Sequence, residues 1–203
     1  MQAFIEIRKN GKIVESRKSK SFLIAFVGLI ARQWCQDTDL LNDTGGNAHT
    51  LGSTDHRLEC ESPGGMGFTH SDLYYPNYQL ESDRVGIVVG SGTGAVAPSD
   101  YALGTQIRSG DTTSKLFYHG TGLHSFSVNV GAGTAQFEIE AIFQNKSGGS
   151  IDVKEVGLYT NGLVGYQVYP NRFGYCILRD NITTVTLSNG EFLQVVYTIS
   201  IAA

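Results

Sequence analysis

The chain has 203 residues, of which 25 are glycine, four are proline and 17% are charged, a composition typical of a turn-rich β domain large enough to bury a core. Its formal net charge of -4 gives no overall attraction to nucleic acid, whose binding proteins usually carry a basic surface. The longest apolar run, residues 22–31, is about half of the ~20 residues that a membrane-spanning helix needs and does not resemble a signal peptide. We therefore expect neither nucleic acid nor membrane as a partner.

The N-terminal segment, residues 1–36, is predicted to contain a β-hairpin and one α-helix. Residues 3–8 and 12–15 flank Asn10-Gly11, which is the strongest short-range signal for a tight hairpin. Ser19 or Ser21 could then cap a helix over residues 22–34. Because this helix would be apolar over a wide arc, we expect it to be covered by the β domain or by another subunit.

The next segment, residues 37–83, lacks any sustained period of 2 or 3.6 and is predicted to be a long irregular loop. Its aromatic cluster at residues 73–78 offers a large contact area, and Pro76 limits the freedom lost on docking. We expect a neighbouring subunit to order this loop. The candidate interface residues of the two segments are Phe22, Phe26, Ile30, Trp34, Leu73, Tyr74, Tyr75 and Tyr78.

Residues 84–203 are predicted to form an antiparallel β-sandwich or jelly-roll body. Strands are expected at residues 84–89, 115–118, 125–130, 166–169 and 175–178. The closing strand alternates, with Leu193, Val195, Tyr197, Ile199 and Ile201 on one face. A strict two-residue hairpin at Asn189-Gly190 would place Leu193 out of phase with the preceding strand, so a longer loop or a bulge is expected there.

The body is organised around residues 137–159, which are predicted to be two strands joined by a tight polar hairpin loop at residues 145–150. The first strand alternates between apolar residues and the pair Glu138 and Glu140. In the second strand, the apolar positions change phase after Lys154-Glu155, which predicts a bulge that lets the strand change neighbours.

Three strings within this body resemble β-rich virion proteins of tailed bacteriophages. They are FQNKSGGSIDVKEVGLY at residues 143–159, CILRD at 176–180 and LSNGEFLQVVYTISI at 187–201. In those proteins, a strand that ends in EVGLY and a closing strand after an Asn-Gly turn recur. The likeness runs from about residue 85 to the C-terminus, and more faintly over the N-terminal hairpin and helix. It implies a component of a virus particle and transfers no catalytic residue to this chain.

Catalytic and cofactor patterns are weak. The glycine-rich residues 90–94 follow a strand, but Pro98 and Ser99-Asp100 predict a turn instead of the helix that a dinucleotide or phosphate site needs. Glu138 and Glu140 share a strand face, as glycosidase carboxylates can, yet solvent-facing charges alternate in the same way. No catalytic residue and no cofactor is predicted.

Metal binding is also disfavoured. The histidines and their neighbours fit no zinc spacing, and the three cysteines are too widely spaced for a disulfide framework or a zinc ribbon. The groups considered were His49, His56, Asp55 and Cys60; the pair His119 and His124; and the cysteines Cys35, Cys60 and Cys176.

The sequence therefore predicts a non-enzymatic structural component of a tailed phage particle, made in the bacterial cytoplasm and located in the virion. It would be a capsid decoration, head-tail or tail protein that binds copies of itself and other virion proteins. The alternative is a receptor- or carbohydrate-binding module of a tail tip or fibre. In that role Tyr74, Tyr75 and Tyr78 would stack on a host-surface glycan.

Overall fold

The computed structural model describes residues 2–19, 22, 40–42, 44–50, 83, 85–164 and 171–202. This part of the chain is mainly β, as predicted, and its strands are all antiparallel to their ladder neighbours. The strands are β1 (Gln2–Lys9), β2 (Lys12–Lys18), β3 (Leu40–Asn42), β4 (Ala48–Thr50), β5 (Gly86–Gly90), β6 (Phe117–Asn129), β7 (Thr134–Gln144), β8 (Ile151–Val164), β9 (Asn171–Leu187) and β10 (Phe192–Ala202).

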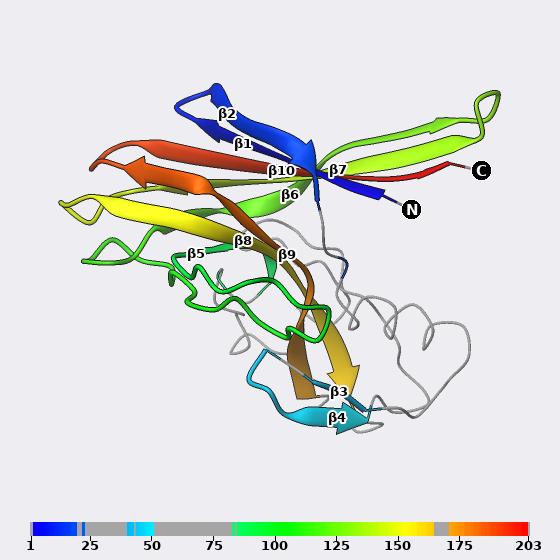
Figure 1. Cartoon of the computed structure of the whole chain (residues 1–203), viewed down its shortest axis with the longest axis horizontal. Coiled ribbons are helices and arrows are strands. Elements are labelled where there is room, and N and C mark those ends of the chain that lie inside the picture. Colours follow the sequence, from blue (N-terminus) through cyan, green and yellow to red (C-terminus); the bar gives the residue numbers. More distant parts are fainter. Residues whose placement is uncertain are drawn as a thin grey trace, which may run out of the picture.

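Two sheets form a sandwich-like body. The larger sheet has the order β2-β1-β10-β7-β6 and the smaller sheet has the order β5-β8-β9. Figure 1 shows the larger sheet above the smaller one, with the two chain termini close together at one end. A third pair, β3 and β4, forms a short hairpin inside the segment that the sequence pattern had predicted to be irregular.

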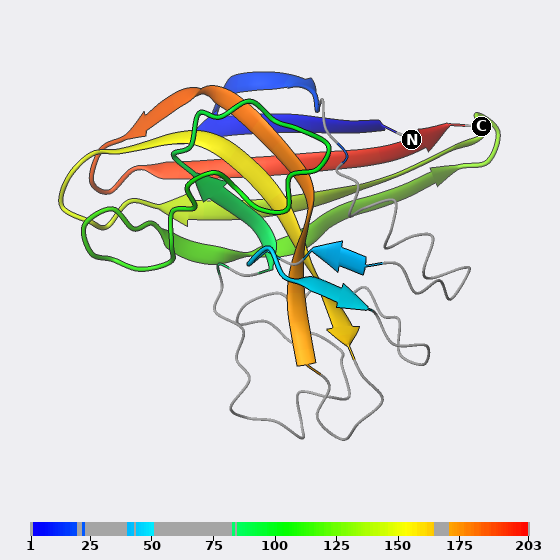
Figure 2. The same ribbon diagram turned by 60° about the horizontal axis from the view of Figure 1, so that its bottom comes forward.

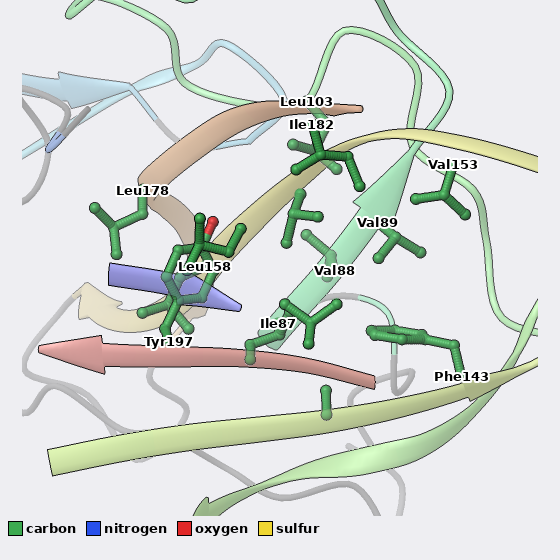
Figure 3. Close-up of a cluster of buried hydrophobic side chains, with 14 of the residues drawn as sticks. Ile87, Val88, Val89, Leu103, Phe143, Val153, Leu158, Leu178, Ile182 and Tyr197 are labelled. Atoms are coloured by element: carbon green, nitrogen blue, oxygen red, sulfur yellow. The ribbon is translucent and has the colours of Figure 1, made fainter. Parts of the chain in front are cut away.

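The core lies between the two sheets, because alternate residues of each strand point inward. On the larger sheet, Leu193, Val195, Tyr197 and Ile199 of β10 are buried, which confirms the predicted wall, whereas Ile201 is exposed. The side chains that meet between the layers include Phe143 and Tyr197 from the larger sheet and Val153, Leu158 and Leu178 from the smaller one (Figure 3).

Strand β5 is buried on both faces. Ile87, Val88 and Val89 are all inaccessible to solvent. The outer edge of this strand is also covered, because residues 91–116 fold back along it. The Ile107 amide donates to the Val89 carbonyl at 2.9 Å, and the Ser91 amide donates to the Thr105 carbonyl at 2.8 Å. The β5 edge of the smaller sheet is therefore covered by residues of the same chain.

The prediction that residues 137–159 form a hairpin is wrong, because the two strands do not pair with each other. Both strands form, but β7 belongs to the larger sheet and β8 to the smaller, so residues 145–150 cross from one layer to the other. The turn at Asn189-Gly190 crosses back in the same way from β9 to β10, which is why its strands do not follow hairpin phase. The predicted bulge in β8 is confirmed by the register shift between Val153 and Glu155, although β8 keeps β9 as its neighbour on both sides of it.

Asn145 holds the two crossings together. Its buried side-chain amide donates to the carbonyls of Gly149 and Leu187, both at 2.7 Å, and its backbone carbonyl accepts from the Gly190 amide at 2.7 Å. One side chain therefore satisfies backbone groups of both loops, which would otherwise lose their partners at the closed end of the sandwich.

The predicted N-terminal hairpin is confirmed, with positive φ at both Asn10 and Gly11. Because β1 pairs with β10 along its whole length, the hairpin is part of the larger sheet (Figure 2). The predicted helix over residues 22–34 and the predicted strand over 166–169 fall outside the described residues, Phe22 excepted.

Among the described residues, no helix has the length and apolar character needed to cross a membrane.

Candidate functional site

A buried glutamate fixes the longest described loop to the body. Oε1 of Glu155 accepts from the amides of Gly92 at 2.9 Å and Thr105 at 2.8 Å. Oε2 accepts from the Gly104 amide at 3.0 Å and from Arg179 Nε and Nη2 at 3.0 and 2.9 Å. We call this arrangement the glutamate clamp; it consists of Glu155, Arg179, Asp100 and residues 90–105.

Charge balance in the glutamate clamp comes from Arg179, which also donates from Nη1 to Asp100 at 2.7 Å. Burial lowers the pKa of Arg179, but the hydrogen bonds to Asp100 and Glu155 outweigh it, so the net pKa is raised. Since Glu155 is 0% exposed and its partner remains charged, the pair is compensated inside the protein.

The glycines of residues 90–94 make room for this carboxylate. A Cβ added at Gly90 or at Gly92 would lie 2.6 or 2.3 Å from Glu155 Oε1, whereas at Gly94 the nearest atom is 3.9 Å away. The Gly92 amide, which a phosphate could otherwise use, donates to Glu155. The glycine-rich stretch is therefore a structural loop packed against Glu155, and the turn lies at residues 98–99.

A second buried network joins the two layers at β2 and β9. Asp180 accepts from Arg17 Nη1 at 3.1 Å, from the Ser19 hydroxyl at 2.6 Å and from the Tyr197 hydroxyl at 3.2 Å. Glu15 accepts from the Thr183 amide at 2.7 Å and from Arg17 Nε. Burial opposes ionisation of Glu15, but the hydrogen bonds from Thr183 and Arg17 outweigh it and lower its pKa.

The far end of the β6–β7 hairpin projects beyond the smaller sheet. We call residues 125–137 the arm; Figures 1 and 2 show it extending past β8 and β9. Its side chains Phe126, Val128 and Val130 are 67%, 56% and 88% exposed. Phe126 lies opposite Phe137, and Val128 lies opposite Ala135, so they continue the inner, core-facing side of the sheet. Exposed apolar surface of this kind usually marks a contact site.

A smaller aromatic cluster lies on the outer face of the larger sheet. His119 lies between Phe117 and Phe192, with ring centroids 4.9 and 6.0 Å from its own. The Lys146 ammonium lies 3.7 Å from the centroid of the Phe117 ring. This exposed set of aromatic and cationic groups could stack on a planar or sugar-like ligand.

Other candidates from the sequence have structural contacts. Glu138 and Glu140 do share the outer face, but Glu138 accepts from Ser125 at 2.9 Å and Glu140 accepts from Gln194 at 2.8 Å. These contacts favour the interpretation of Glu138 and Glu140 as polar residues of the outer face over their interpretation as a pair of glycosidase carboxylates. Burial raises the pKa of Cys176, which keeps its thiol protonated and unreactive.

Among the side chains that the structure describes, no group of three metal-binding residues comes together. The side chains of His49, His56, Asp55, Cys60 and His124 lie outside this set.

The predicted interface residues are mostly outside the described part of the chain. Phe26, Ile30, Trp34, Leu73, Tyr74, Tyr75 and Tyr78 fall there. Phe22 is half-buried, packs against the core and forms an isolated bridge with Leu178 of β9. Its role in a subunit contact stays a prediction.

Sequence reasoning did not find the glutamate clamp or the arm. No local signal marked the glutamate clamp, because Glu155 follows Asp152 and Lys154, and Arg179 precedes Asp180, so neither stands out as a lone charge. The signal for the arm was the absence of Asp, Glu, Lys and Arg from residues 116–137. Comparison of the chain with protein-family models, curated proteins and solved structures gives no match.

Proposed function

We propose that this protein is a non-enzymatic structural component of a tailed phage particle that acts through contacts between subunits. The observation that carries the proposal is the arm, where Phe126, Val128 and Val130 are more than half exposed and the first two extend the core-facing side of the sheet. Such a surface is costly to leave in water and gains from burial against another protein.

The assignment to a phage particle rests on the resemblance of residues 143–159, 176–180 and 187–201 to virion proteins. Two elements of that resemblance have structural roles in this chain: Glu155 of EVGLY anchors residues 90–105, and Asn189-Gly190 carries the chain between layers. A protein built for repeated contacts needs such fixed loops, because binding a preordered surface costs less entropy. A jelly-roll connectivity and a helix over residues 22–34 remain part of this proposal.

The experiment is quantitative mass spectrometry of gradient-purified phage particles and of the lysate that produced them. The proposal predicts that the chain sediments with particles in several copies per particle, at a ratio to the major capsid protein that is constant across the particle peak. Recovery of the chain only in the soluble fraction would reject the proposal.

The second candidate function is a receptor- or carbohydrate-binding module, which the Phe117–His119–Phe192 cluster with Lys146 favours. A glycan array probed with the wild type and with the Phe117→Ala variant tests it. Saturable binding to a defined glycan that the variant loses would support this function over a purely structural one.

A further inference from the structure

The two edges of the larger sheet differ in charge. Strand β2 carries four charged residues out of seven: Lys12, Glu15, Arg17 and Lys18. Strand β6, at the opposite edge, has 13 residues and none that is Asp, Glu, Lys or Arg. Charged side chains discourage pairing with foreign strands, whereas a long uncharged edge presents its unpaired backbone groups as a template. The β6 edge therefore lacks the protection that charged side chains of its own would give.

Most other edges of the sandwich are already engaged. Strand β2 is tied to β9 through Glu15 and Arg17, and β5 is covered by residues 103–107. The first half of β6 contacts β5, where the Ile87 amide donates to Thr121 Oγ1 at 3.0 Å. From Ser125 to Asn129, β6 has only β7 as a ladder neighbour within the part of the chain that the structure describes.

We infer that residues 125–129 pair with the same segment of a second copy of the chain, antiparallel across a two-fold axis. The inference deepens the proposed function, on which it rests, by naming one partner and the surface that binds it. A two-fold axis brings a surface against itself, so any charge on the arm would approach its own copy. The arm, residues 125–137, contains no Asp, Glu, Lys or Arg, so two copies can approach each other without repulsion between like charges.

Side-chain identity selects the register of this pairing. With Ser127 on the axis, Phe126 lies opposite Val128 of the second copy, and Ser125 lies opposite Asn129. An aromatic side chain facing a β-branched one is a favourable cross-strand pair, and polar residues then face each other on the opposite side. The register shift between Leu123 and Ser125 and the turn after Asn129 limit the regular pairing to this segment.

The main test compares two lysine substitutions of equal exposure at the two sheet edges. Val128 is 56% exposed on the arm, and Ile13 is 57% exposed on β2. Sedimentation equilibrium over a concentration series should show a dimer for the wild type and for Ile13→Lys. Val128→Lys should weaken the dimer by at least ~10-fold, because two lysines would face the same small interface. Circular dichroism should show that both variants keep the wild-type fold.

A cross-link tests the register. Cysteine at position 127 on the axis would lie opposite its own copy, at a Cβ separation close to the one that a disulfide needs. In a background with Cys35 and Cys60 changed to serine, Ser127→Cys should form a disulfide-linked dimer under mild oxidation. The matched variant Ser16→Cys, exposed on the β2 edge, should not.

Three results would overturn the inference: a wild type that is monomeric at every concentration, an assembly that survives Val128→Lys, or equal cross-linking at positions 16 and 127. A chain that sediments with particles but is monomeric in solution would reject the two-fold pairing alone. A dimer in solution that never reaches particles would reject the proposed function while leaving the pairing intact.

Discussion

Replacing Glu155 by glutamine removes one charge from the glutamate clamp while keeping the shape of the side chain. Both carboxylate oxygens accept from donors: Oε1 from the Gly92 and Thr105 amides, and Oε2 from the Gly104 amide and Arg179. Glutamine has one acceptor oxygen, so its NH₂ group must face donors on one side or the other. Arg179 would keep only Asp100 as a charged partner among the contacts described above.

The expected magnitude is large. Breaking one partner of a buried ion pair costs ~3–5 kcal/mol, because the other charge stays desolvated. Since the interaction with Asp100 remains, we expect Glu155→Gln to lower the free energy of unfolding by about 3 kcal/mol. Against a total of ~5–15 kcal/mol, this is a substantial part of the stability of the domain.

Urea unfolding followed by circular dichroism measures this loss, with linear extrapolation to water. The matched control is Asp152→Asn, an exposed carboxylate three residues earlier on β8, which should change stability by less than ~0.5 kcal/mol. Hydrogen exchange gives the local readout: the Gly92, Gly104 and Thr105 amides should lose protection in the glutamine variant. A stability within ~1 kcal/mol of wild type, or unchanged protection at those amides, would refute the reasoning.

Three further predictions concern single residues. Gly92→Ala should destabilise the fold by ~1–3 kcal/mol because its Cβ would overlap the carboxylate of the glutamate clamp, whereas Gly94→Ala should be nearly neutral; thermal unfolding of the pair decides this. Asn145→Ala should cost about 1–3 kcal/mol in urea unfolding, because the carbonyl of the buried Leu187 and the carbonyl of Gly149 lose their donor, and a change below ~0.5 kcal/mol would show that the crossings do not depend on it. The pKa of Glu15 is lower in the folded than in the unfolded chain, so its contribution is present above its unfolded value of ~4.3 and is lost as pH falls through the folded value. The stability difference between wild type and Glu15→Gln should therefore be full at neutral pH and shrink in acid, and a difference that does not vary with pH would contradict this.

Local patterns predicted the strands well and their connections poorly. The alternation of β10 and the Asn10-Gly11 turn depend on neighbouring residues, and both are confirmed. The polar loop at residues 145–150 also looked like a hairpin turn, but turn chemistry does not say whether the next strand joins the same sheet or the opposite one. The crossing that forms is held by Asn145, whose hydrogen-bond partners are Gly149, four residues away, and Leu187, 42 residues away.

The site was less predictable than the fold. Glu155 and Arg179 are 24 residues apart, and the amides that bind Glu155 come from a segment about 50 residues earlier. These groups come together only after β5 and β8 have paired, so no short-range sequence pattern predicts the network. The arm is different, because its uncharged edge is visible in residues 116–137, but its exposure depends on where the smaller sheet ends.

Electron cryo-microscopy of purified particles tests the central claim, a structural role through subunit contacts, most directly. The account predicts repeated density for the two-sheet body in every particle, with the edges of residues 125–129 of neighbouring copies side by side. Particles that contain no density for this body, with the chain recovered only outside them, would contradict the account.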